Sequence, residues 1–217
     1  MPYLCGVVAF RKRLFRVFKR GEQKSMMNKL FKKISAVAIA TAMTFSTGVA
    51  ANAATMKVYL REWKQNNVSD TYTGTPVYTF GTEPVVVVKN VQKGTTYKAA
   101  LNAGVSDTFK LGWNPNNSQY LDSITLVDEE GEKAVWKNNG KNTNPDYNGS
   151  TMVGATWVGS SWMWYSGDNI ALTNTSTYPT TTLGETLVPV QKENSDDEVF
   201  SVVLSYDTTQ FNWGTRE

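Results

Sequence analysis

The amino-acid sequence predicts an α+β fold, in which one helix packs on a mixed and mostly antiparallel β-sheet. Three observations support this prediction. Residues 55–217 are rich in Thr, Asn, Val, Tyr and Trp, which favour strands and turns over helices. Only residues 93–104 combine helical spacing of apolar residues with good cap residues. The segments on both sides show the alternation or the β-branched runs of strands.

Two strands are predicted before the helix. Residues 56–63 (MKVYLREW) form the first strand, and the polar residues 65–76 that follow form a loop. Residues 84–91 (PVVVVKNV) are a continuous β-branched run. We therefore expect a central strand that is buried on both faces.

The helix is predicted from its caps and from its apolar face. Thr95 or Thr96 can accept hydrogen bonds from the first free N–H groups, and Gly104 can end the helix. Tyr97 and Leu101 lie four residues apart, on the same side of a helix. That side is expected to face the sheet.

Several strands are predicted after the helix. Residues 113–119 (WNPNNSQ) are rich in turn-forming residues and are expected to be a loop. Residues 120–136 contain two strands joined by a turn at DEEGE. Residues 137–150 are predicted to be a second polar loop that is mobile or faces a ligand. One or two strands follow within residues 155–172, and residues 198–213 form the last strand.

Residues 27–54 have the organisation of a secretory signal peptide. Three lysines begin it, residues 34–49 are mainly apolar, and residues 51–53 (ANA) supply the small residues that signal peptidase recognises. The apolar stretch is short and contains several Ser and Thr, which disfavours a membrane anchor. We expect cleavage after Ala53 or Ala54, secretion to the extracellular space, and no stable membrane span afterwards.

Residues 1–26 do not fit at the start of a signal peptide. They include a basic segment with amphipathic spacing, but the codons implied just before Met26 and Met27 are typical of a bacterial ribosome-binding site. We therefore expect residues 1–26 to be an over-extended start. Residues 55–217 are long enough for a single domain with its own core.

Charge and reactive side chains limit the function. Ten of the 22 basic residues but only one of the 19 acidic residues lie before residue 55, so that residues 55–217 carry a net charge of −6. A nucleic-acid partner is therefore not expected. The only cysteine is Cys5 and the chain has no histidine, which excludes thiol or imidazole catalysis and thiolate or imidazole metal ligands after export.

The order of the elements, together with certain residues, resembles the DUF4430 family, whose fold is related to the C-terminal β-domain of the vitamin B12 carriers transcobalamin and intrinsic factor. The matching positions are Val85 to Val88, Gly94, Thr96, Leu101, Tyr120, Ser123, Ile124, Gly159, Trp162, Met163, Tyr165, Gly184 and Tyr206. They span residues 80–206. Two positions depart from the family pattern, because Ser166-Gly167 replaces its Asn-Gly and Gly184-Glu185 replaces its Gly-Asp.

The resemblance implies a transcobalamin-like sheet with one helix and a non-enzymatic binding role. In the vitamin carriers this fold covers one side of a corrinoid. A corrinoid or another small molecule is therefore a candidate ligand. No resident cofactor is implied.

Enzymatic chemistry has little support in the residues. Carboxylates such as Asp122, Asp168 and Glu185 can hydrolyse glycosides as a pair, but no spacing in the sequence brings two of them together. The acidic clusters at residues 128–132 and 195–198 lack a recognisable calcium-loop spacing, and solvated turns are the better interpretation. We expect neither an enzyme nor a metal site.

Aromatic residues favour binding. All seven tryptophans lie after residue 54, which is more than a domain of this size needs for its core. In SSWMWYSGD, residues 160–168, a strand would point Trp162 and Trp164 to one face and Met163 and Tyr165 to the other, but both pairs are apolar and either can be the inner one. The candidate ligand-binding residues are Trp113, Asn114, Asn116, Trp157, Trp162, Trp164 and Tyr165.

Three functions remain open. The first is a secreted binding domain of a Gram-positive type of bacterium with a small-molecule ligand. The second is a carbohydrate-binding module that uses exposed Trp and Tyr. The third is a cell-surface module with a protein partner, which an unpaired strand edge would favour.

Overall fold

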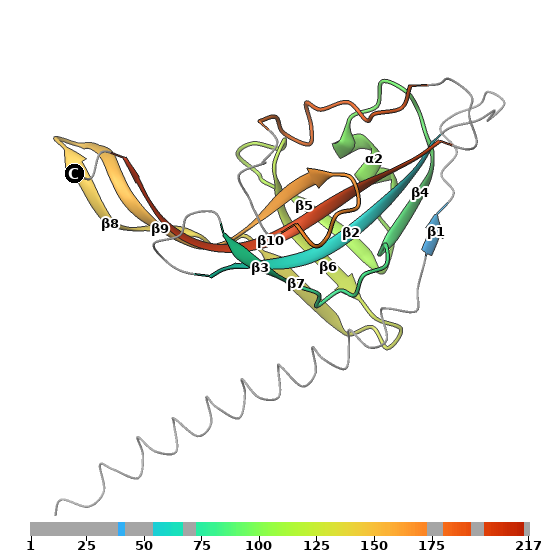
Figure 1. Ribbon diagram of the computed structural model, residues 1–217, viewed down its shortest axis with the longest axis horizontal. Helices are drawn as coiled ribbons and strands as arrows, with labels where there is room; N and C mark the ends of the chain where they lie inside the picture. Colours follow the sequence, from blue (N-terminus) through green and yellow to red (C-terminus); the bar gives the residue numbers. More distant parts are fainter. Residues whose placement is uncertain (1–38, 42–53, 67–72, 173–179, 192–197, 215–217) are drawn as a thin grey trace, which may run out of the picture.

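The computed structural model describes residues 39–41, 54–66, 73–172, 180–191 and 198–214, which form two β-sheets and one helix. This arrangement confirms the predicted α+β class (Figure 1). The elements are β1 (Ile39–Thr41), β2 (Ala54–Gln65), β3 (Gly74–Val77), β4 (Val86–Val91), α2 (Tyr97–Ala103), β5 (Phe109–Trp113), β6 (Leu121–Val127), β7 (Lys133–Lys137), β8 (Lys141–Asn148), β9 (Thr151–Ser166) and β10 (Val199–Gly214). None of the described helical residues forms a helix that is long and apolar enough to cross a membrane.

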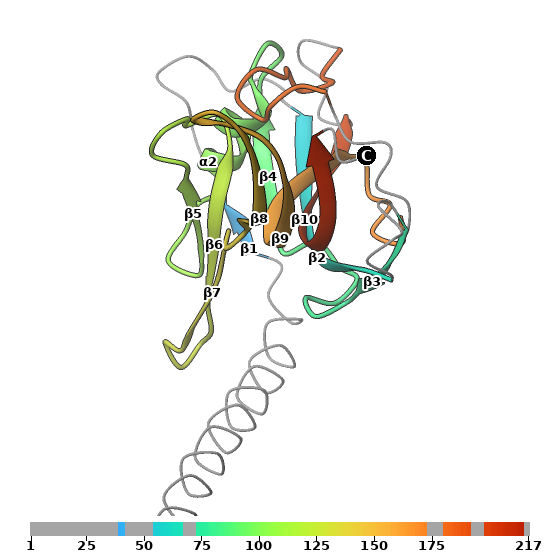
Figure 2. The same cartoon turned by 90° about the vertical axis from the view of Figure 1, so that its left-hand side faces the viewer.

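The larger sheet has the strand order β1-β4-β2-β10-β9-β8, and β3 pairs with β2 off this path. β2 and β10 run in parallel, from Thr55 opposite Val199 to Lys64 opposite Thr208. The β4–β2, β3–β2, β10–β9 and β9–β8 pairs are antiparallel, so that the sheet is mixed and mostly antiparallel, as predicted. The smaller sheet, β5-β6-β7, forms a second layer (Figure 2).

The hydrophobic core fills the space between the two sheets. Successive side chains of a strand point to opposite faces, so that every second residue of β2 and β10 reaches this space. The core residues of these two strands are Met56, Val58, Leu60, Val202, Leu204 and Tyr206. The smaller sheet contributes Phe109, Leu121, Ile124, Leu126 and Trp136. Each large side chain buried here contributes roughly 1.5–3 kcal/mol, which holds the two layers together.

Helix α2 packs beside β4, and its cap residues are among those predicted. The Thr96 hydroxyl accepts a hydrogen bond from the N–H of Ala99 at 3.2 Å. Gly104 follows the last helical residue, and a β-carbon there would lie 2.8 Å from a methyl group of Val88. A larger residue at this position would therefore push the helix away from the sheet. Leu101 is completely buried on the face that the spacing predicts.

Two predicted segments are wrong. The polar loop expected at residues 137–150 contains β8, which pairs with β9 along most of its length. β8 is exposed on both faces, and a strand without a buried face lacks the alternation that would reveal it. The strand predicted at residues 84–91 is not buried on both faces, because Val87 is half-buried and Lys89 is exposed. Only one face of β4 meets the core.

Some of the other strands were predicted from the sequence, and some were not. β6 and β7 with the turn between them confirm the two strands at residues 120–136, and β10 confirms the last strand. Residues 155–172 contain one strand, the end of β9. The loop expected at residues 65–76 ends in β3, and β5 had no counterpart among the predicted strands.

The predicted translation start and signal peptide lie outside the described residues, apart from two short pieces. Ile39–Thr41 form β1, which pairs in parallel with Val86–Val88. Ala54 begins β2.

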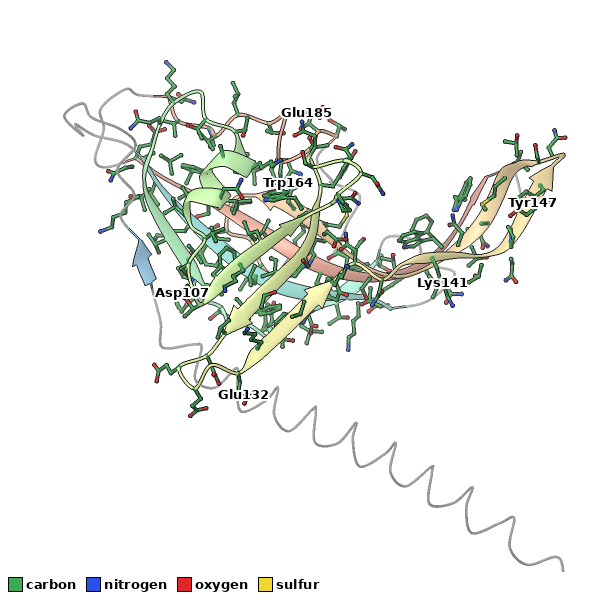
Figure 3. The ribbon with its side chains drawn as sticks, turned by 180° about the vertical axis from the view of Figure 1, so that it is seen from behind. Asp107, Glu132, Lys141, Tyr147, Trp164 and Glu185 are labelled. Atoms are coloured by element: carbon green, nitrogen blue, oxygen red, sulfur yellow. The ribbon has the colours of Figure 1, made fainter. Side chains whose placement is uncertain are left out.

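Three strands continue beyond the two-layer body. β8, the first half of β9 and the last part of β10 run together away from the core (Figure 1). We call residues 140–159 and 208–214 the arm. Figure 3 shows it from Lys141 near its base to Tyr147 towards its tip. The arm lies outside the core, so that its stability depends on its own cross-strand contacts.

A polar network is buried on the face of the larger sheet that points away from the core. The completely buried Arg61 donates from Nε to Ser205 Oγ at 2.7 Å, and the Ser205 hydroxyl donates to a carboxylate oxygen of Asp207. The Tyr165 hydroxyl donates to the other Asp207 oxygen at 3.3 Å, and the Tyr165 ring lies 5.0 Å from the Arg61 guanidinium carbon. This network therefore ties β2, β10 and β9 together.

Arg61 also holds the segment that follows β9. Its Nη1 donates to the carbonyl oxygens of Ile170 and Leu172. Its Nη2 is buried and has no hydrogen-bond partner within the described part of the chain. An unsatisfied buried donor costs stability, so that the other hydrogen bonds of Arg61 must offset this cost.

Replacing Arg61 is expected to destabilise the fold strongly. The Arg61→Ala change leaves the buried Asp207 carboxylate without the nearby guanidinium charge, and losing one member of a buried charged network costs about 3–5 kcal/mol. Tyr165→Phe removes the hydrogen bond to Asp207 but keeps the ring beside Arg61, and should cost only about 1 kcal/mol. Urea unfolding of both variants and the wild type measures the two costs. Equal stability of Arg61→Ala and wild type would contradict the role assigned to this network.

Candidate ligand-binding site

The aromatic stretch singled out in the sequence lies on β9, and its two faces are distinct. Trp162 and Trp164 point to the side of the core, opposite Tyr206 and Leu204 of β10. Met163 and Tyr165 point to the opposite side, as the strand alternation predicts. The inner pair is therefore the tryptophan pair.

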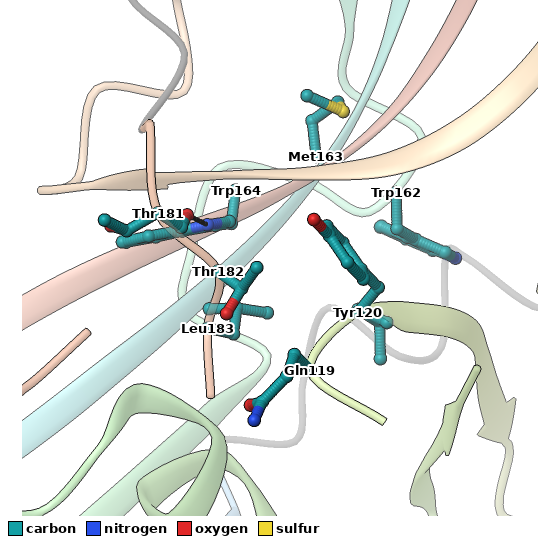
Figure 4. A pocket seen from close by; sticks show the side chains of 9 residues that line it. Gln119, Tyr120, Trp162, Met163, Trp164, Thr181, Thr182 and Leu183 are labelled. Carbon is teal, nitrogen blue, oxygen red and sulfur yellow. Dashed lines mark hydrogen bonds between the residues drawn. The ribbon is translucent and has the colours of Figure 1, made fainter. Parts of the chain in front are cut away.

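A shallow apolar hollow opens beside these two indoles. It has a volume of about 100 Å³ and is lined by Gln119, Tyr120, Leu121, Trp162, Met163, Trp164, Thr181, Thr182 and Leu183. Three separate segments of the chain meet here: the start of β6 with the two residues before it, the last part of β9, and residues 181–183. Figure 4 shows Tyr120 between the two indoles. Three aromatic side chains therefore form one wall of the hollow.

Both indoles are fixed from behind. Trp162 is buried and donates from Nε1 to the carbonyl oxygen of Trp136 at 2.9 Å, and its ring centre lies 5.1 Å from that of Tyr206. Trp164 is half-buried and donates from Nε1 to the carbonyl oxygen of Thr181 at 3.3 Å. Its ring centre lies 5.0 Å from that of the buried Tyr97. The apolar surface is therefore formed before any ligand arrives.

Two polar groups at the hollow have no hydrogen-bond partner among the described residues. One is the hydroxyl group of Tyr120, a residue that is 53% exposed. The side-chain amide of Gln119 lies against Gly184, where a β-carbon would come within 1.5 Å of its oxygen. That amide also has no hydrogen-bond partner among the described residues. A few free polar groups around an apolar surface are typical of a ligand site.

The loop before Tyr120 is held by its own asparagines. The side-chain oxygen of Asn114 accepts hydrogen bonds from the N–H groups of Asn116 and Asn117, at 2.9 and 3.2 Å. The Asn114 N–H donates to the carbonyl oxygen of Tyr120 at 2.9 Å. Asn114 therefore shapes the loop that presents Tyr120, and Asn116 is exposed beside it.

The other candidate residues lie apart from the hollow. Trp113 is half-buried at the end of β5, where its Nε1 donates to Asn102 and the Lys98 ammonium lies 5.0 Å from its ring. Trp157 lies on the arm. Tyr165 is buried in the network around Asp207 on the opposite face of the sheet, so that we do not include it in this site.

Tyr120 and Gln119 are not among the binding residues predicted from the sequence. Tyr120 is named there only as a position that matches the DUF4430 pattern. One signal for Tyr120 was present, because an aromatic residue directly after a turn-rich loop is often exposed. No sequence signal indicates that residues 181–183 meet this loop.

The acidic turn between β6 and β7 is structural. The Asp128 carboxylate accepts hydrogen bonds from the N–H groups of Glu130 and Glu132, at 3.0 and 2.8 Å. Within the described ranges, no group of three or more His, Cys, Asp or Glu residues is placed to hold a metal ion. Most of the second acidic cluster, residues 195–198, lies outside these ranges.

A comparison with known proteins finds no matching family model, no matching curated protein and no matching solved structure. The resemblance to the DUF4430 family therefore stays a prediction based on the motifs given above.

The two tyrosines behind the indoles are expected to make the fold sensitive to alkali. Burial raises the pKa of Tyr97 above its usual value of 10.0. Burial also raises the pKa of Tyr206, although its hydrogen bond with Ser160 lowers it and the charge of Glu62 raises it. Above about pH 10 the unfolded chain loses phenol protons that the folded protein keeps. The free energy of unfolding should therefore fall as the pH rises through this range.

Tyr97→Phe is expected to make this decline shallower while the stability at pH 7 changes little. Urea unfolding of the wild type and of Tyr97→Phe between pH 7 and pH 11 gives the two slopes. If the slopes above pH 10 are the same, burial of Tyr97 does not contribute to the alkaline sensitivity.

Proposed function

We propose that this chain is an exported, non-enzymatic binding domain whose ligand site is the aromatic hollow at Tyr120, Trp162 and Trp164. The observation that supports it best is the pre-formed aromatic wall. Both indoles are held by hydrogen bonds and by rings behind them, so that a ligand would meet a surface that needs no reordering. Pre-organisation lowers the entropic cost of binding.

The lining of the hollow favours binding over catalysis. None of the residues that line it is charged, and none is a histidine or a cysteine. Its tyrosine and threonine hydroxyl groups are weak nucleophiles unless a neighbouring base activates them, and the lining contains no imidazole, carboxylate or amine that could act as that base. The polar groups at hand are the Tyr120 hydroxyl and the Gln119 amide, which can orient a ligand through hydrogen bonds.

The size of the hollow limits what enters it. Sites that enclose a drug-sized ligand measure roughly 300–1,000 Å³, whereas this hollow measures about 100 Å³. It can therefore receive one flat ring or a small apolar group, and a larger ligand would lie across it. A corrinoid would contact the site in this second manner, with only one edge inside.

Export is proposed from the sequence of residues 27–54. The net charge of residues 55–217 and the lack of thiols there suit a secreted domain.

Tyr120→Ala is expected to weaken ligand binding about tenfold, because truncating a central aromatic contact typically costs more than 1 kcal/mol. Ligand-observed NMR with a set of neutral flat-ring fragments would identify binders and give their dissociation constants. Tyr78→Ala is the matched control, since Tyr78 is also an exposed tyrosine, 44% exposed, but does not line the hollow. Fragments that bind both variants and the wild type equally would refute the proposed site.

Cyanocobalamin tests the corrinoid version separately. Trp162 and Trp164 lie in the hollow, so that a corrinoid seated there should quench tryptophan fluorescence beyond its inner-filter effect. A free-tryptophan solution of matched absorbance supplies that correction. No excess quenching at micromolar ligand excludes the corrinoid and leaves the smaller ligands.

A further inference from the structure

The arm has one face on which large aromatic side chains gather. The pairing of β9 with β10 places Trp157 opposite Phe211 and Ala155 opposite Trp213. Asn142 of β8 lies opposite Trp157, on the same face. We call this the indole face of the arm. It points away from the hollow side of β9, because Trp157 and Trp162 lie five positions apart along the strand and successive side chains alternate between its faces.

Trp157 lies flat against the sheet. A β-carbon on Gly140 would come within 1.9 Å of the six-membered ring of Trp157, so that the indole rests directly on the backbone of residue 140. Only glycine leaves this space open. Trp157 is half-buried, and the rest of its surface is exposed to solvent.

Trp213 is held on the same face by a hydrogen bond. Its Nε1 donates to the side-chain oxygen of Asn142 at 3.0 Å, and this contact joins β10 to β8 across β9. The residue opposite Trp213 on the intervening strand is Ala155, which is 0% exposed although it lies on the arm. The indole of Trp213 therefore covers Ala155, and it remains 36% exposed itself.

Asn142 fixes the arrangement. Its oxygen accepts from Trp213, and its side-chain NH₂ donates to the sulfur of Met152 at 3.9 Å. Two indoles thus lie on one face of the arm, one packed against the backbone of Gly140 and one hydrogen-bonded to Asn142. Such rings present a rigid apolar plane with little conformational entropy left to lose on binding.

The indole face has no charge in the described part of the arm. The two charged side chains of β8, Lys141 and Asp146, lie opposite Val158 and Gly154 and so belong to the other face. A nucleic acid or an anionic lipid surface would need basic side chains here. The polar groups around the indoles are amides and hydroxyls, from residues such as Asn142 and Thr209.

The edge of the arm does not suit an added strand. β8 is the edge strand, and it contains Pro145, which has no N–H group to donate. Asn144 has a positive φ of 48°, and the pairing with β9 shifts register after Thr143 and after Asp146. An added partner strand needs a regular edge to pair with, and these features interrupt this edge. Binding on the arm is therefore expected on its face.

We propose that the indole face of the arm binds a neutral polysaccharide chain. The C–H faces of pyranose rings are flat and apolar and stack on indole rings, while their hydroxyl groups hydrogen-bond with side-chain amides. Two partly exposed indoles on an uncharged, amide-bearing face match this chemistry. This site is separate from the hollow of the body and does not depend on the function proposed for it.

The experiment measures retention of the purified protein on insoluble cellulose, chitin and starch. Heparin-agarose and phosphatidylcholine vesicles represent a polyanion and a lipid surface. The wild type should bind at least one of the three neutral polysaccharides. Trp213→Ala should weaken that binding roughly tenfold or more, as expected for an aromatic residue at the centre of a contact. Asn142→Ala should weaken it in the same direction, because it releases Trp213.

Asn212→Ala is the matched control for Asn142→Ala. Asn212 is an exposed asparagine of the arm on the opposite face, where its side-chain oxygen accepts from Thr156. It should leave polysaccharide binding unchanged, and so should Tyr120→Ala in the hollow. Melting curves of all variants confirm that each one is folded.

Two results would overturn the proposal. One is that no neutral polysaccharide retains the wild type, including the case in which only heparin or the vesicles do. The other is that the folded Trp213→Ala variant binds as well as the wild type.

Discussion

The parallel pairing of β2 with β10 is the constraint on which the rest of the structure depends. These strands come from opposite ends of the described chain, and Arg61 and Ser205, which bridge them, are 144 residues apart in sequence. Closing so long a loop costs conformational entropy, although this cost grows only slowly with length. Val58, Leu60, Val202 and Leu204 offset it on the core side. The buried Arg61–Ser205–Asp207 network offsets it on the other side.

β10 extends from this parallel pair to both aromatic surfaces, the hollow and the indole face. It pairs with β9 without a register shift from Val202 to Gly214, so that the body and the arm share two continuous strands. Leu204 and Tyr206 set the position of Trp164 and Trp162 at the hollow. Phe211 and Trp213 do the same for the indole face. Because the two surfaces lie on opposite faces of β9, a ligand on one does not compete directly with a ligand on the other.

The sequence was informative where a buried face produced a pattern. Thr96 and Gly104 marked the helix correctly, because caps are local interactions between neighbouring residues. The alternation of residues 162–165 separated two pairs, but both are apolar, and only the packing on Tyr97 and Tyr206 shows which is inner. β8 was missed because an exposed strand has no such pattern. The meeting of Tyr120 with residues 181–183 depends on chain topology, which no local pattern encodes.

Five of the seven tryptophans fall into two groups with different physical roles. Trp63, Trp136 and Trp162 are buried, and their removal would leave large cavities. Trp157 and Trp213 pack on the arm and are not part of the hydrophobic core of the two-layer body. Because the arm lies outside the core, its own cross-strand contacts must stabilise it. The packing of Trp157 on Gly140 and the pairing of Trp213 with Ala155 are two such contacts. Smaller β-branched residues at these two positions would also stabilise the strand pairs, so that strand pairing alone does not require tryptophan. Two large rings that are held in place and are still partly exposed to solvent therefore point to a surface that is used.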